Sequence, residues 1–190
     1  MAPRDSARDA LGRGLPLSSP PPAQRAGGGA QLRSSCFGCK FRTEVAFTDT
    51  DRATLTQLLA AGKASAASER RAIGKAGAWF DRRIGAEAGT RGHMARAGVS
   101  LMFNDGQFDC IDASRNMTSL LLVLDQLKLL HHHAVDVPKS RGLLVDGRGL
   151  HVTAVLREKA QGKKWAVDSW TRSYGQAPEI IPLTLWMTQD

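Results

Sequence analysis

Apolar residues recur at helical spacing in one long segment in the second half of the chain. Between Cys110 and Leu130 the i, i+3, i+4, i+7 pattern is made by Met117, Leu120, Leu121, Leu124 and Leu127. Leu122, Val123 and Leu130 widen the apolar face until it nearly encircles the helix, which predicts a helix covered on most sides in the middle of a domain. Asp109 is a good N-cap residue, and Asp112 adds a further acceptor in the first turn.

Two weaker helical patterns precede it. Asp51 or Thr54 is expected to cap a short helix that ends at Gly62 and carries Leu55, Leu58 and Leu59. A second helix is expected to begin near Ser65 or Ser68 and to end at Gly85 to Gly89, with an apolar face made of Ile73, Ala76, Phe80 and Ile84. A short strand is expected at residues 99–103.

After Pro138 the apolar period changes from helical spacing to two. Strict alternation is seen at Leu150, Val152, Ala154 and Leu156, and again at Trp165 and Val167. The segment Lys159–Lys163 between them contains Gly162 and predicts a turn, so the two runs form a β-hairpin. Residues 180–186 are another short apolar segment, interrupted by Pro182. Helices first and strands last predict a mixed α+β domain.

Composition divides the chain into a tail and a domain. Residues 1–43 are rich in Pro, Gly, Ser and Arg, and they carry +5 of the net charge of +8. Such a segment cannot bury enough apolar surface to offset its ordering entropy, so we predict a disordered basic tail over 1–43 and a single domain over 44–190.

The charge and hydropathy of the rest exclude some classes of function. The domain is only modestly basic, and its aromatic residues do not alternate with Lys and Arg, so we predict no nucleic-acid partner. No apolar run approaches the roughly 18 residues that span a bilayer, so we predict no membrane partner. Without a signal-peptide pattern the expected location is cytoplasmic, or periplasmic or secreted if the start codon is mis-set.

The sequence offers little for a metal ion. Cys36 and Cys39 form a C-x-x-C pair that has no second pair and no nearby histidine, which favours an incidental pair over a zinc or redox site. The run His131–His133 follows the long helix and is interpreted as a solvated helix end, where imidazolium suits the helix dipole. We predict neither a metal nor a cofactor.

Three residues in suitable contexts indicate nucleophilic chemistry. Cys110 opens the long helix, His151 begins the first strand of the hairpin, and Asp168 ends the second. A thiol, an imidazole and a carboxylate in this order can serve as nucleophile, base and orienting group. Of the tryptophans Trp165, Trp170 and Trp186, Trp170 is the best candidate for a cleft residue, since it lies two positions after Asp168.

The register of the hairpin decides whether His151 meets Asp168. If the hairpin centres between Lys159 and Ala160, the two residues are directly opposite, about 5 Å apart at Cβ. If it centres on Gln161, they are about three residues out of register. Only the first register, or a bulge that restores it, is expected to give the hydrogen bond.

Three short blocks resemble a known family. The runs Asp109-Cys110-Ile111-Asp112, His151-Val152-Thr153-Ala154-Val155 and Trp165-Ala166-Val167-Asp168-Ser169-Trp170 are similar to the signature blocks of transglutaminase-like cysteine proteinases, most closely the small bacterial members. The resemblance covers roughly residues 65 to 186. It implies a papain-like α+β fold in which a central helix carrying the Cys packs against an antiparallel sheet carrying the His and Asp.

The same resemblance implies roles for the three residues. Cys110 would be the nucleophile, His151 the general base and acid, and Asp168 the group that orients the imidazole. Ile111 stands where true transglutaminases commonly carry Trp, which favours a peptidase or amidase over a protein cross-linking enzyme. The expected partner is a peptide or amide substrate.

The identity of the second oxyanion donor stays open at this stage. Gln107 and Asn104 are candidates by their chemistry alone. Two alternatives to a peptidase also stand: a cell-wall amidase of the cysteine-peptidase type, and a non-catalytic protein-binding domain on the same fold. The second is favoured by the acidic neighbours of Cys110, because negative charge raises the pKa of a thiol.

Overall fold

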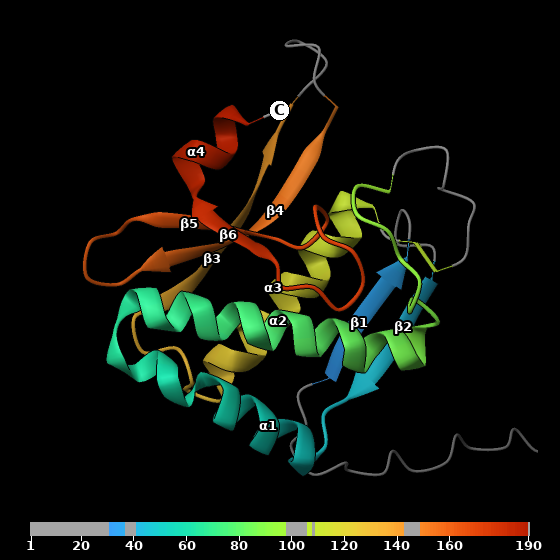
Figure 1. The fold of residues 1–190 in the computed structure, drawn as a ribbon, viewed down its shortest axis with the longest axis horizontal. Helices are drawn as coiled ribbons and strands as arrows, with labels where there is room; N and C mark the ends of the chain where they lie inside the picture. The colour runs from blue at the N-terminus through green and yellow to red at the C-terminus, as the bar shows by residue number, and fades with distance from the viewer. Residues whose placement is uncertain (1–30, 37–40, 98–105, 108, 143–148, 190) are drawn as a thin grey trace, which may run out of the picture.

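The computed structural model describes residues 31–36, 41–97, 106–107, 109–142 and 149–189, with side chains described from Val45 onward. It contains a two-stranded sheet, a four-stranded sheet and four α-helices within these ranges (Figure 1). The predicted mixed α+β architecture is therefore confirmed. The predicted strand at 99–103, Asn104 and the residues 1–30 of the predicted tail lie outside the described residues.

The described chain begins with a hairpin. Strand β1 (Gln31–Cys36) pairs antiparallel with β2 (Phe41–Ala46), from Gln31 opposite Ala46 to Cys36 opposite Phe41. These strands lie partly within residues 1–43, the segment that the sequence predicts as a tail. Its composition resembles a disordered segment, but pairing with a second strand satisfies its backbone.

Two helices follow at the positions that the sequence predicts. Helix α1 (Asp49–Ala60) begins one turn earlier than expected, because Thr48 caps it and Asp51 returns the bond to the Thr48 backbone. Helix α2 (Ala66–Ala88) is capped by Ser65 and ends at Gly89, whose φ of 72° suits glycine. A 3-10 turn, η1 (Ala61–Ala64), joins the two helices.

Helix α3 (Cys110–Gln126) starts at the predicted residue and ends four residues before Leu130. Asp109 caps its first turn by accepting from the backbone of Asp112 at 2.7 Å. The helix stops because Lys128 takes a left-handed conformation, with φ of 56°, and the backbone N–H of Leu129 turns back to Leu124. Helix α3 packs against strands of both sheets and is the central element of the fold.

The larger sheet has the order β3-β4-β5-β6 and is antiparallel throughout. Its strands are β3 (His133–Arg141), β4 (His151–Glu158), β5 (Lys164–Asp168) and β6 (Glu179–Pro182), and the short helix α4 (Leu183–Thr188) follows. Strands β4 and β5 form the predicted hairpin. Strand β3 was not predicted; its pairing shifts between Asp136 and Lys139, where Pro138 lacks a backbone N–H.

One apolar cluster joins these elements. Helices α1, α2 and α3 contribute Leu55, Leu59, Ile73, Phe80, Leu120, Leu121 and Leu124, and the larger sheet contributes Ala154, Leu156 and Val167. The apolar positions that the sequence predicts on α2 are all buried. Because α3 packs against β4 within this cluster, the N-terminus of α3 lies beside the start of β4.

Candidate functional site

The first turn of α3 brings Cys110 to the start of strand β4. The Cys110 thiol donates to the backbone carbonyl of Leu150 at 3.5 Å, and it also receives a backbone hydrogen bond from Val152. These two residues flank His151, so the sulfur lies against the stretch of backbone that carries the predicted base. The side chain of Ser169 ties the end of β5 to the same helical turn by donating to Ala113 at 3.4 Å.

His151 and Asp168 form a buried pair. The Nε2 atom of His151 lies 2.5 Å from the Asp168 carboxylate, and the two residues are 5% and 1% exposed. The other ring nitrogen of His151, Nδ1, is buried and has no hydrogen-bond partner within the described ranges. The nitrogen that a base would use is therefore the one that the carboxylate leaves available.

The observed register differs from both registers considered from the sequence. Ala154 pairs with Val167 and Arg157 with Lys164, so the hairpin centres between Ala160 and Gln161. Asp168 then falls opposite Thr153, and His151 is its diagonal neighbour two residues along the same face. The expectation that this bond needs exact opposition was wrong, because diagonal neighbours at about 7–8 Å lie within reach of long side chains.

Asp168 accepts two further hydrogen bonds that hold its carboxylate. The indole Nε1 of Trp186 donates to it at 2.8 Å, and the backbone N–H of Trp170 donates at 3.1 Å. The rings of the same two tryptophans pack against the His151 ring, with centroids 4.6 Å away for Trp170 and 5.2 Å for Trp186. The guanidinium of Arg141 lies over the Trp186 ring, 4.4 Å from its centroid. The imidazole is thus fixed both by its ring contacts and by its carboxylate partner.

The electrostatics around the sulfur favour the thiol over the thiolate. Burial raises the pKa of Cys110 above its ordinary value, and the carboxylates of Asp109 and Asp168 raise it further. Backbone hydrogen bonds from Val152 and from the N–H of Cys110 itself act in the opposite direction without cancelling the rise. A thiolate at neutral pH therefore requires that a neighbouring base take the proton.

Gln107 does not serve as an oxyanion donor in this arrangement. Its side-chain oxygen accepts from the backbone of Met94 at 2.9 Å, and its nitrogen donates to the carbonyl of Gly92 at 3.2 Å. Both ends of the amide hold the loop that follows α2. The backbone N–H of Cys110, at the first position of α3, has no acceptor within the helix and bonds the Cys110 sulfur.

The interpretation of His131–His133 as a solvated helix end was wrong for His133. His133 is fully buried instead of solvated, and its Nδ1 lies 2.6 Å from the buried carboxylate of Glu69. The same carboxylate accepts from the backbone N–H groups of His131 and His132. No group of His, Cys, Asp or Glu suited to a metal ion occurs among the residues that the structure describes. His133 therefore begins strand β3, and the bonds from all three histidines to Glu69 anchor that strand to α2.

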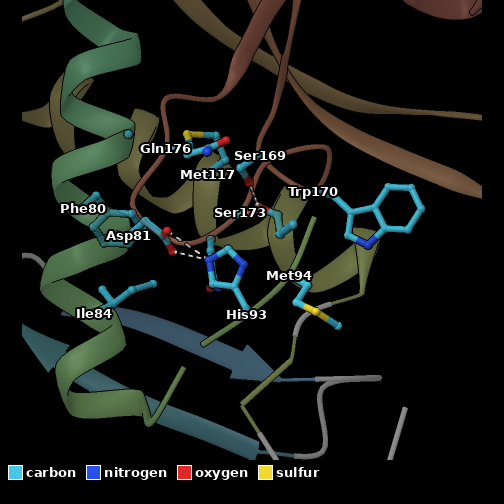
Figure 2. Close-up of a pocket in the computed structure, with 13 residues that line it drawn as sticks. Phe80, Asp81, Ile84, His93, Met94, Met117, Ser169, Trp170, Ser173 and Gln176 are labelled. Atoms are coloured by element: carbon cyan, nitrogen blue, oxygen red, sulfur yellow. Dashed lines mark hydrogen bonds and ion pairs between the residues drawn. The ribbon is translucent and has the colours of Figure 1, made fainter. Parts of the chain in front are cut away.

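A pocket lies beside the three predicted residues, between α2, the first turns of α3 and the loop that follows β5 (Figure 2). Its walls include Phe80, Ile84, Met94, Met117 and Trp170, with polar side chains from Asp81, His93, Asn116, Ser169, Ser173 and Gln176. Of these residues, the sequence analysis identified only Trp170 as a candidate for a cleft. A signal for Asn116 existed, since it is a polar residue next to Met117 on the apolar face of α3.

Comparison with protein-family models, with curated proteins and with solved structures found no match to this chain. The resemblance to transglutaminase-like cysteine proteinases stays a prediction. None of the described helices has both the length and the apolar character needed to cross a bilayer.

Proposed function

We propose that this chain is a thiol-dependent acyl-transfer enzyme, a cysteine peptidase or amidase on a papain-like or transglutaminase-like α+β fold. Cys110 is the nucleophile, His151 the general base and acid, and Asp168 the orienting group. One observation carries the proposal. His151 is held by Asp168 through Nε2, its Nδ1 is left without a partner in the described part of the chain, and the Cys110 sulfur lies on the backbone directly before His151.

The chemistry follows from these positions. The Cys110 thiol leaves the Leu150 carbonyl and gives its proton to Nδ1 of His151. The sulfur then attacks the carbonyl carbon of an amide, and the oxygen that gains the negative charge is met by the backbone N–H of Cys110. His151 returns the proton to the leaving amine as the C–N bond breaks, which leaves an acyl group on Cys110. Water or a second amine then attacks this thioester and gives its proton to His151. The C–S bond breaks, the acyl group leaves as an acid or a new amide, and the Cys110 sulfur takes the proton back from His151.

The role of Asp168 is to keep the imidazole in one tautomer and orientation. A carboxylate that accepts from Nε2–H leaves Nδ1 as the acceptor, and it stabilises the imidazolium that forms during the reaction. Its bonds from Trp170 and Trp186 prevent the carboxylate from turning away. The raised pKa of Cys110 fits this scheme only if proton transfer to His151 generates the thiolate.

The proposal is tested by trapping the acyl-enzyme. The full chain is mixed with p-nitrophenyl acetate, the release of p-nitrophenol is followed, and the site of acetylation is read by mass spectrometry. We expect a burst of p-nitrophenol and an acetyl group on Cys110, both lost in Cys110→Ala. Acetylation that is confined to Cys36 or Cys39, or that is equally fast in His151→Phe, would contradict the proposed roles.

A non-catalytic protein-binding domain is the second candidate, and one observation favours it. The Cys110 thiol is bonded to the Leu150 carbonyl instead of to His151, and its pKa is raised. In that case the three residues stabilise the junction of α3, β4 and β5 and take no part in chemistry. The trapping experiment separates the two candidates, since a structural cysteine of this kind forms no acyl-enzyme.

A further inference from the structure

The pocket near Cys110, His151 and Asp168 is lined by a buried side-chain amide that has no hydrogen-bond partner among the described residues. Asn116 is 5% exposed and lines the pocket from the second turn of α3. Neither its Oδ1 nor its Nδ2 has a hydrogen-bond partner among the described residues. Buried polar groups in proteins are almost always paired, because an unpaired one keeps the full cost of its desolvation. An unpaired amide that lines a pocket is therefore placed to bind a group that enters it.

The remaining walls specify the rest of that group. Phe80, Ile84, Met94 and Met117 offer apolar surface, so the part that passes them is apolar. The one carboxylate among the described lining residues, Asp81, is already engaged: His93 lies 2.9 Å from it (Figure 2), and the backbone N–H of Gly175 donates to it at 2.6 Å. The described lining thus offers no uncompensated acid to attract a cation. It suits an uncharged group.

The amide of Asn116 determines which chemical group fits at the end of the bound side chain. It offers one acceptor and one donor side by side, and a group that matches this pair with two parallel hydrogen bonds and no charge is another amide. A carboxylate pairs only with the nitrogen and leaves the Asn116 oxygen facing a negative charge. An alkyl tip pairs with neither. The complementary group is an apolar stem that ends in a carboxamide.

The pocket adjoins the proposed nucleophile by two routes. Ala113 lines it and lies one helical turn after Cys110 on α3. Trp170 also lines it, and the Trp170 ring lies 4.6 Å from the His151 ring. Ser169 joins the two walls by donating to Ala113. A side chain seated in the pocket is therefore one helical turn from Cys110 along α3 and in contact with the tryptophan that packs on His151.

We infer that this pocket is a substrate side-chain subsite selective for an uncharged side chain with an apolar stem and a carboxamide tip, read by Asn116. The word substrate rests on the proposed thiol chemistry, whereas the binding of the side chain does not. Asn116 is thus a specificity-determining residue. Its unpaired amide is retained for recognition, although an apolar residue of similar size would suit the folded protein better.

Binding is tested on the ¹⁵N-labelled full chain by NMR, with three small probes. 3-Methylbutanamide has the stem and the amide, 3-methylbutanoate has the same stem and a charge, and acetamide has the tip alone. We expect 3-methylbutanamide to shift the side-chain NH2 signals of Asn116 and to bind about tenfold tighter than either control, since the paired bonds and the stem each contribute. Equal binding of the amide and the carboxylate, or no shift at Asn116, would overturn the inference.

The variant Asn116→Leu lacks the side-chain amide, so the NH2 signals that it loses are those of Asn116. We expect it to unfold at the same temperature as the wild type or higher, and to lose the preference for the amide over the carboxylate. Gln126→Leu, which removes an exposed amide from the end of the same helix, is the matched control and should keep that preference. A large fall in the unfolding temperature of Asn116→Leu would mean that the amide is already satisfied inside the protein, which also overturns the inference.

The link to Cys110 is tested with N-acetylated amino-acid chloromethyl ketones that carry the side chain of Gln, Glu or Leu. We expect the Gln reagent to alkylate Cys110 about tenfold faster than the Glu reagent, and Asn116→Leu to favour the Leu reagent instead. If the probes bind but Cys110 shows no such preference, the pocket is no substrate subsite. If none of the reagents alkylates Cys110 faster than a free thiol, the proposed function fails while the NMR result still decides the binding.

Discussion

Replacing Asp168 by Asn should destabilise the protein strongly although the two side chains have nearly the same shape. Asp168 is 1% exposed and accepts three hydrogen bonds. One oxygen, Oδ2, accepts from His151 at 2.5 Å and from the indole of Trp186 at 2.8 Å, and the other, Oδ1, accepts from the backbone of Trp170 at 3.1 Å. Asn has a single acceptor atom, so at least one of these donors must face its NH2 group.

The magnitude follows from which donor loses its partner. If the Asn oxygen takes the place of Oδ2, the backbone N–H of Trp170 is left facing a donor. In the other orientation the indole of Trp186 is left unpaired and the imidazole must change tautomer. Hydrogen bonds to charged groups contribute about 1.5–3 kcal/mol each, and a buried unpaired donor adds to the cost, so we expect a loss of about 2–4 kcal/mol in the free energy of unfolding.

The assay is equilibrium unfolding in urea, followed by tryptophan fluorescence. Asp125→Asn is the control, because Asp125 is exposed on α3 and its substitution should change the unfolding free energy by less than about 0.5 kcal/mol. If Asp168→Asn unfolds at the same urea concentration as the wild type, Asp168 does not hold the three donors, and the orientation of His151 needs another explanation.

Two other substitutions test the frame around the site. Glu69→Gln should lower the unfolding free energy by about 3 kcal/mol, because the hydrogen bond between the buried carboxylate and His133 loses its charge. Burial raises the pKa of Glu69, but the hydrogen bonds from His133 and the neighbouring backbone outweigh it and hold this pKa below the ordinary 4.5. In urea titrations the wild type should therefore lose this stability as the pH falls below 4.5, and an equally steep loss in the variant would contradict the assignment. Gly77→Ala should lower the unfolding free energy by about 1–3 kcal/mol in the same assay, because the added Cβ would lie 2.8 Å from Pro178. Gly74→Ala on the same helix has space for its Cβ and should raise the unfolding free energy by up to about 1 kcal/mol. Equal effects of the two substitutions would refute the close approach of α2 to Pro178.

The starts of α2 and α3 could be predicted from the sequence because their causes are local. Asp109 lies at the N-cap and accepts from a backbone group three residues away, so the position of Cys110 at the first turn of α3 depends on no distant residue. The same holds for Ser65 at the start of α2 and for Gly89 at its end. Placing Cys110 at a helix start was therefore within reach of pattern analysis.

The hairpin shows where local reasoning stopped. Alternation predicts both strands and shows which residues share a face of the sheet. It does not show which residue lies opposite which, because that pairing depends on the five-residue turn. That turn is set by Gly162, which has φ of 69° and donates to Glu158 at 2.8 Å, and by the bond from the Glu158 backbone to Lys163. The observed register makes His151 and Asp168 diagonal neighbours, a geometry that the analysis of direct opposition did not include.

Contacts between distant segments were not predictable at all. Glu69 and His133 are 64 residues apart, and neither the helix pattern around the first nor the polar run around the second indicates the other. For the same reason His133 was expected in solvent. The pocket is a further case: Asp81, His93 and Asn116 come from three separate segments, and only the packing of α2 against α3 brings them together.

The rate at which Cys110 reacts with iodoacetamide at neutral pH tests the central claim most directly, because it measures whether His151 converts a buried thiol into a nucleophile. We predict that Cys110 in the wild type is alkylated at least about tenfold faster at pH 7 than N-acetylcysteine. In His151→Phe, which keeps a ring between the two tryptophans but has no base, the raised pKa of Cys110 should make alkylation slower than that of the free thiol. Equal rates in the wild type and in His151→Phe, both below that of N-acetylcysteine, would contradict the account.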